Sequence, residues 1–96
     1  MDLNINYDET RSIGNQLIAK ADEYSSLIDS VRHTNEEITT YWNGSDATKY
    51  FQTVGEQDQY MRQLAATIAE IGNYLIRVGN AYEEASQNNA NSINLY

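Results

Sequence analysis

Apolar residues recur along the first half of the chain at alternating steps of four and three residues. The series runs from Leu17 to Trp42, and Asn35 is its single polar member. A 3.5-residue repeat of this kind is typical of a helix that packs lengthwise against another helix. It predicts a first helix over about residues 8–42. The apolar positions of the series are Leu17, Ala21, Tyr24, Ile28, Val31, Ile38 and Trp42.

A second series with the same repeat runs from Ala47 to Ala85, and Gln57 is its single polar member. Chance periodicity seldom lasts so long, so the series predicts a second helix over about residues 46–86. Its apolar positions are Ala47, Tyr50, Val54, Met61, Leu64, Ile68, Ile71, Leu75, Val78, Tyr82 and Ala85.

The two series are separated by Asn43-Gly44-Ser45. Gly44 can adopt a left-handed backbone conformation, so residues 43–45 form a predicted turn, and a short connection joins antiparallel helices. At the start of the first helix, Asn6 followed by Glu9 has the spacing of a capping box. Residues 87–96 are rich in Asn and Ser and predict a flexible tail. Residues 1–96 are thus expected to form one all-α domain, an antiparallel helix–turn–helix hairpin.

Small residues form a row beside the second series, one every seven positions: Ala65, Gly72, Gly79 and Ser86. Glycine within a helix costs roughly 1 kcal/mol relative to alanine, so two glycines in one row suggest a compensating contact. We expect the two helices to approach closely along this row, with Gly14 roughly opposite Tyr74.

A lone hairpin leaves apolar side chains uncovered, because two helices share only one line of contact. Burying an aliphatic or aromatic side chain is worth about 1.5–3 kcal/mol, which favours pairing two hairpins into a four-helix bundle. The side chains beside the seams are Ile13, Ile18, Leu27, Phe51, Tyr60 and Tyr74. The residues expected to form the hairpin and dimer seam are Leu17, Tyr24, Ile28, Val31, Ile38, Met61, Leu64, Ile68, Ile71, Leu75 and Val78.

The chain has a formal net charge of −8, and its six basic residues are scattered along the sequence. Such a surface repels phosphate backbones and anionic lipid heads, so we expect no nucleic-acid partner and no membrane interaction at neutral pH. The sequence shows neither a secretory signal peptide nor an apolar run of about 20 residues. These two signals taken alone predict a cytoplasmic protein.

Nothing in the sequence predicts catalysis or a cofactor. His33 is the single histidine, and cysteine is absent. The adjacent acidic pair Glu36-Glu37 cannot converge on a substrate, because neighbouring positions in a helix diverge by about 100°. No metal-ligand spacing and no phosphate-binding loop is present. We therefore expect a protein that is not an enzyme.

Trp42-Asn43-Gly44 lies at the midpoint of this cysteine-free chain, between the two apolar series. In this respect the chain resembles the WXG family, small ESAT-type proteins exported by type VII (ESX) secretion systems. The resemblance covers nearly the whole chain. It implies a secreted helical dimer that is exported without a signal peptide. Trp42 and Gly44 then either have only a structural role, with Trp42 covering the end of the bundle, or are also read by partners or the export machinery.

One part of the family pattern is not matched. Exported members carry a Tyr-x-x-x-Asp/Glu signal near the end of the second helix, whereas Tyr82 is followed four positions later by Ser86. Tyr82, Glu83 and Glu84 then represent either a divergent signal or part of a subunit that is exported with a partner carrying the signal.

The resemblance favours an exported substrate or co-secreted companion. Its partner is then a second copy, a related helical hairpin or the helical export domain of a larger toxin, together with the type VII machinery. Two alternatives remain open: a cytosolic helical adaptor, and a membrane-active protein whose helices insert at low pH.

Overall fold

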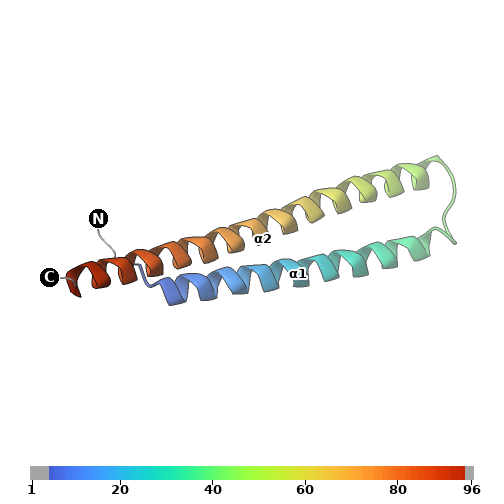
Figure 1. Ribbon diagram of the computed structural model, residues 1–96. Coiled ribbons are helices and arrows are strands. Elements are labelled where there is room, and N and C mark those ends of the chain that lie inside the picture. The colour runs from blue at the N-terminus through green and yellow to red at the C-terminus, as the bar shows by residue number, and fades with distance from the viewer. Residues whose placement is uncertain (1–4, 95–96) are drawn as a thin grey trace. The chain divides into compact units, whose positions relative to one another are not determined.

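A computed structural model describes residues 5–94 of the chain, with side chains up to residue 88. Within this range the chain forms two helices, α1 (Tyr7–Ile38) and α2 (Ser45–Asn94), joined by a turn (Figure 1). This confirms the predicted all-α helical hairpin. The chain divides into two compact units. We call Lys20–Thr67 the turn unit, and the described parts of Met1–Ala19 and Ile68–Tyr96 the glycine unit.

Asn6 caps the start of α1, as its spacing from Glu9 predicts. The Asn6 Oδ1 atom accepts a hydrogen bond from the Glu9 backbone N–H at 3.0 Å, and the Asn6 carbonyl accepts one from the Thr10 N–H at 2.9 Å. These bonds satisfy donors that have no partner inside the helix. Asp8 and Glu9 place negative charge in the first turn, where the helix dipole favours it.

α1 ends earlier than the predicted residue 42. The backbone N–H groups of Thr39 and Thr40 donate to the carbonyls of Glu36 and Glu37 at 3.1 and 3.3 Å. Their hydroxyl groups donate to the same two carbonyls, each at 2.6 Å. These shorter-range bonds satisfy the last carbonyls of the helix, so the regular helix is not continued. The connection therefore covers residues 39–44 instead of the predicted 43–45.

Gly44 begins α2. Its φ angle is +114°, a conformation that side chains disfavour, and this confirms the predicted role of a glycine in the turn. Its carbonyl accepts hydrogen bonds from both the backbone N–H and the hydroxyl of Thr48, each at 3.1 Å. Gly44 thus occupies the N-cap position, and the first helical residue is Ser45.

α2 continues to Asn94, so the predicted end at residue 86 and the predicted flexible tail are wrong for residues 87–94. Asn and Ser disfavour a helix only weakly, by a few tenths of a kcal/mol each. Neither glycine nor proline follows Gly79, so no strong stop signal interrupts the helix. Residues 95–96 of the predicted tail lie outside the described residues.

In the turn unit the two helices run antiparallel and bury small side chains between them. The Tyr50 hydroxyl donates to Asn35 at 2.8 Å, and Arg62, further along α2, reaches back to Asp29 at 2.6 Å. The buried apolar residues of this unit are Ala21, Ile28, Ala47 and Ala65, each 2–3% exposed. Three alanines among four buried residues mean that the helices approach closely here.

In the glycine unit the helix backbones themselves are in contact. A methyl group on Gly14 would lie 2.5 Å from the Gly72 carbonyl oxygen, and one on Gly72 would lie 2.6 Å from the Gly14 carbonyl oxygen. One on Gly79 would lie 2.9 Å from the Tyr7 carbonyl oxygen. Gly72 and Gly79 therefore lie at the contact, as predicted, whereas Ser86 at the end of the row is exposed. Gly14 meets Gly72 and Ile76, which flank the predicted position 74.

Candidate interaction surfaces and the turn motif

The structure separates the predicted seam residues by their exposure. Ile28 is buried, at 3%. The half-buried members are Leu17, Tyr24, Ile38, Met61, Ile68, Leu75 and Val78. The exposed members are Val31, Leu64 and Ile71, at 45%, 51% and 49%. The apolar series therefore includes residues that pack within a unit and residues that remain open to solvent.

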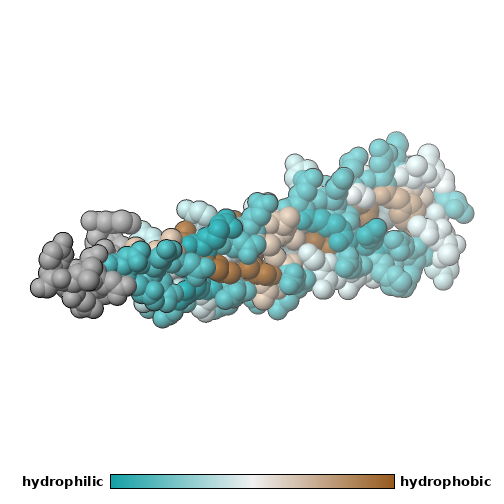
Figure 2. All heavy atoms as spheres, in the orientation of Figure 1, coloured by the Kyte–Doolittle hydropathy of each residue, from teal (hydrophilic) through white to brown (hydrophobic). Residues whose placement is uncertain are grey.

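Each unit carries exposed apolar residues of this kind, and we call them together the apolar flank. They are 45–73% exposed: Leu27, Val31, Tyr60 and Leu64 in the turn unit, and Ile13, Ile71 and Tyr74 in the glycine unit. At about 100° per residue, Leu27 and Val31 lie about 40° apart around α1, and so do Tyr60 and Leu64 around α2. In the glycine unit, Ile71 and Tyr74 lie about 60° apart around α2. Hydrophobic surface bordered by hydrophilic residues is visible on the face drawn in Figure 2.

Within the turn unit the apolar flank is hollowed. A depression of about 440 Å³ is lined by residues of α2, among them Tyr60, Met61, Leu64 and Thr67. Exposed apolar side chains next to a hollow are typical of surfaces that contact another protein.

Carboxylates recur every seven residues on a different side of α1. Asp22, Asp29 and Glu36 form this acidic flank within the turn unit. Asp22 and Val31 are nine positions apart, which is about 180° around the helix. The acidic flank therefore faces away from the apolar flank. The seven-residue spacing of these acids is visible in the sequence, but the apolar series does not predict it.

Arg62 connects the acidic flank to α2. Its guanidinium contacts Asp29 at 2.6 Å and Asp58 at 2.7 Å. The Asp58 side chain is only 17% exposed, and its hydrogen bond with Arg62 lowers the pKa of the Asp58 carboxyl below its usual value. The same hydrogen bond, together with that of Asp29, raises the pKa of Arg62. Arg62 therefore stays charged and favours the ionised form of Asp58.

The turn motif carries an aromatic cluster within the turn unit. The Trp42 ring centroid lies 5.2 Å from that of Tyr50 and 6.1 Å from that of Phe51, and the last two rings are 5.5 Å apart. Tilted and edge-on pairs at these distances are favourable. Trp42 nevertheless remains 38% exposed, and the neighbouring Tyr41 is 88% exposed. The cluster therefore packs three rings together and leaves part of its aromatic surface open to solvent.

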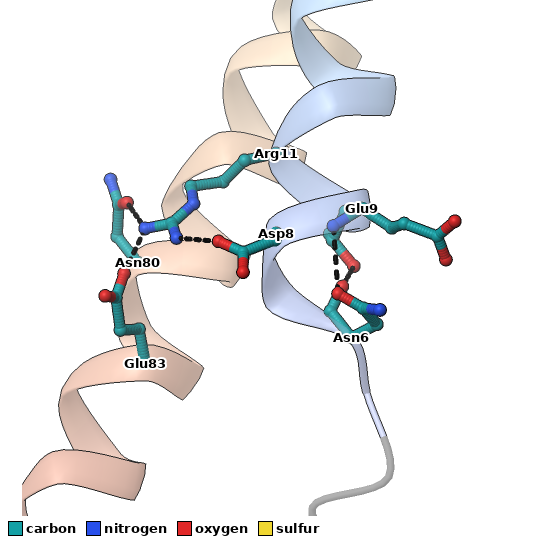
Figure 3. Close-up of polar contacts among 7 residues, drawn as sticks. Asn6, Asp8, Glu9, Arg11, Asn80 and Glu83 are labelled. Carbon is teal, nitrogen blue, oxygen red and sulfur yellow. Dashed lines mark hydrogen bonds and ion pairs between the residues drawn. The ribbon is translucent and has the colours of Figure 1, made fainter.

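The predicted export-signal residues lie in the glycine unit, and one of them is bound to α1. Arg11 hydrogen-bonds Glu83 and Asn80 on α2, the latter at 2.9 Å (Figure 3). Arg11 also contacts Asp8 at 2.7 Å, and hydrogen bonds to Asp8 and Glu83 raise the pKa of its guanidinium. Tyr82 is half-buried and Glu84 is exposed. Local sequence patterns do not reveal the contact between Arg11 and Glu83, because the two residues are far apart in the chain.

The described residues show no arrangement that suggests a metal site or a catalytic site. Across residues 5–94, no group of three or more His, Asp or Glu side chains could hold a metal ion. The His33 side chain is 78% exposed and lies 3.8 Å from the Glu37 carboxylate. Neither α1 nor α2, as far as the structure describes them, has an apolar stretch long enough to cross a membrane.

Together, the helical hairpin, the apolar flank and the Trp-x-Gly turn define a class of small helical proteins that assemble through their helices. The model of the WXG100 family, described as proteins of 100 residues with WXG, matches residues 2–87. The chain therefore belongs to the WXG100 family. This is a non-enzymatic family of helical proteins associated with type VII secretion, and its members generally pair with partner hairpins.

A solved structure shares the fold. Geobacillus thermodenitrificans EsxA (crystal form I) matches with a TM-score of 0.80 and 19% sequence identity, covering 93% of this chain and 99% of that chain. A comparison with curated protein sequences finds no match.

Proposed function

We propose that this protein is an exported substrate or co-secreted companion of a type VII secretion system, and that it acts as a helical dimer. The observation that carries the proposal is the apolar flank. Full burial of an aliphatic or aromatic side chain contributes about 1.5–3 kcal/mol, and a partner can supply roughly half of this at each position, because these side chains are 45–73% exposed. A second hairpin on the flank completes a four-helix bundle, the arrangement that a two-helix protein of this size needs for a full core.

A second copy of the chain is a partner that the placement of the acidic flank allows. Although the net charge is −8, Asp22, Asp29 and Glu36 lie on the side of α1 away from the apolar flank. Two copies can therefore meet through their apolar flanks without bringing these carboxylates together. The repulsion between the two acidic flanks is thereby kept away from the contact.

The test is the composition and route of the native complex. Protein purified from its native source is expected to behave as a dimer in analytical ultracentrifugation at micromolar concentration. It should appear in the culture medium when the secretion ATPase is intact and remain in the cells when the ATPase is deleted. A monomer in the first experiment would contradict the dimer, and purely cytosolic protein in both strains would contradict export.

A cytosolic helical adaptor is the second candidate, and the end of α2 favours it. Ser86 stands where the family signal has an acid, and the neighbouring Glu83 is bound to Arg11. Tyr82→Ala and Trp42→Ala variants separate the candidates. Export should fall in both variants if these residues are read by the machinery, whereas an adaptor would never reach the medium.

A further inference from the structure

A second groove in the turn unit lies on the side of the acidic flank. It has a volume of about 330 Å³ and is lined by Arg32, Glu36 and Thr39 on α1 and by Phe51, Val54 and Gly55 on α2. Gly55 and Leu64 are nine positions apart, about 180° around α2. The groove and the apolar flank therefore face opposite sides of that helix. A partner that covers the apolar flank leaves the groove open.

Gly55 is the glycine of α2 that packing does not explain. A methyl group built there would meet no atom within 4 Å, whereas methyl groups on Gly72 and Gly79 would collide with α1. Glycine in a helix interior is destabilising relative to alanine. Its effect at this position is to keep the groove open, with Phe51 and Val54 half-exposed beside it.

The groove belongs to an acidic unit. Its lining carboxylates are Glu36, which lies 3.7 Å from Arg32, and Asp58, which lies 2.7 Å from Arg62. The turn unit as a whole holds eight acidic and four basic residues, a formal net charge of −4. This field attracts cations and repels nucleic acid, anionic lipid and a second copy of this acidic chain.

We propose that the groove binds a basic amphipathic segment of another protein. One apolar or aromatic side chain of the segment sits over Gly55 against Phe51 and Val54. Lysine or arginine side chains next to it are attracted by the net negative charge of the turn unit and contact Glu36 and Asp58, which already bind Arg32 and Arg62. The site is separate from the apolar flank, so each chain of a dimer can hold one such segment.

The first test maps where a basic peptide binds. The probe is a synthetic helical peptide of leucine and lysine with one tryptophan, titrated into the ¹⁵N-labelled full-length protein at micromolar concentration. The amide signals of Gly55 and Thr39 are expected to shift, and a peptide with every lysine replaced by glutamate is expected to cause no shift. Shifts confined to the apolar flank around Leu64, or none at all, would overturn the proposal.

A matched pair of variants tests the role of Gly55. Gly55→Leu fills the groove with a side chain and is expected to weaken binding of the basic peptide about tenfold or more. Gly55→Ala changes the helix propensity while leaving most of the groove open, and its affinity should stay within about twofold. Both variants should fold, because the position is open, and helical circular dichroism checks this. Equal affinity of Gly55→Leu and the wild type would overturn the proposal.

The charge of the rim is tested separately. Glu36→Gln should weaken binding about threefold and reduce its salt dependence, because one rim carboxylate is removed. Glu70→Gln, at an exposed position of the glycine unit, serves as the control and should leave binding unchanged. Equal effects of the two variants would show that only the total charge attracts the peptide, which contradicts a specific groove.

Discussion

The two units of this protein pair the same two helices in different ways. In the described part of the glycine unit, the buried residues are Gly14, Gly72 and Gly79, so the contact is made by backbone against backbone. In the turn unit the buried residues are side chains, chiefly alanines, with Ile28 as the largest. A contact between glycines brings helices close but buries little apolar side-chain surface. The glycine unit therefore depends more on what covers its outer surface.

The polar contacts differ as well. In the glycine unit, Arg11 joins Asp8 and Asn80 to Glu83. In the turn unit, Arg62 joins Asp29 to Asp58, whose side chain is less exposed than either carboxylate that Arg11 binds. Because solvent screens exposed ion pairs, the network around Arg62 should matter more for stability. The following experiments test these differences, from the largest expected effect to the smallest.

Charge on the apolar flank should have the largest effect. Leu64→Asp combined with Ile71→Asp should dissociate the dimer and unfold most of α2, because covered apolar groups are lost and charges are placed at the contact. Because both side chains are already about half covered within the chain, the expected loss from burial alone is about 1.5–3 kcal/mol per chain. Sedimentation measures the dissociation of the dimer, and circular dichroism measures the unfolding of α2. Of the two single variants, Ile71→Asp should be the more harmful, since Ile71 belongs to the glycine unit.

The control for this experiment is Gln59→Asp combined with Ala66→Asp. Both positions are exposed on α2 and have the same seven-residue spacing. This pair should leave the dimer intact. Native helicity and unchanged mass in the Leu64→Asp, Ile71→Asp protein would count against the assignment of the apolar flank.

Adding one methyl group should have opposite effects in the two units. Gly72→Ala forces the helices apart, because the new group would lie 2.6 Å from the Gly14 carbonyl oxygen. Overpacking of this kind costs about 1–3 kcal/mol. Gly55→Ala meets no neighbouring atom and should stabilise the helix by about 0.5–1 kcal/mol. Thermal unfolding compares the two, and an increase in Tm for both would show that the glycine unit is not close-packed.

The backbone conformation of Gly44 should have the next effect. Gly44→Ala places a side chain at a φ angle of +114° and should destabilise the turn unit by about 1–2 kcal/mol. Gly44→Asn should cost less, because asparagine tolerates positive φ better. Urea denaturation measures both against Ser45→Ala. A stability for Gly44→Ala equal to that of the wild type would mean that the turn adopts another conformation in solution.

The smallest effect concerns acid stability in the turn unit. Because Arg62 lowers the pKa of Asp58, the ionised carboxylate stabilises the folded protein. This contribution is complete above the usual aspartate pKa of about 3.9 and is lost as the pH falls through the lowered value. Asp58→Asn should therefore lose less stability than the wild type between about pH 5 and pH 2. Urea denaturation at each pH measures the free energy of unfolding. The control variant Asp22→Asn should show the same dependence on pH as the wild type.

Much of the fold could be predicted because its signals are local. The 3.5-residue repeats gave two helices, and Gly44 marked the turn. The row with Gly72 and Gly79 indicated a close contact, since glycine within a helix requires some compensation. The helix ends were predicted less well. Bonds from Thr39 and Thr40 end α1 early, and the weak helix-breaking tendency of Asn and Ser did not stop α2.

The sequence by itself determined that two apolar stripes exist and that they lie on helices joined at Gly44. Only the tertiary structure decided which members of each stripe are buried: Ile28 faces the other helix, whereas Leu64 and Ile71 remain exposed. It also decided that Arg11 binds Glu83 and that a groove opens beside Gly55. Periodicity along one helix reports the direction of a side chain around that helix. What the side chain meets there depends on residues distant in the chain, and only the packed structure brings them together.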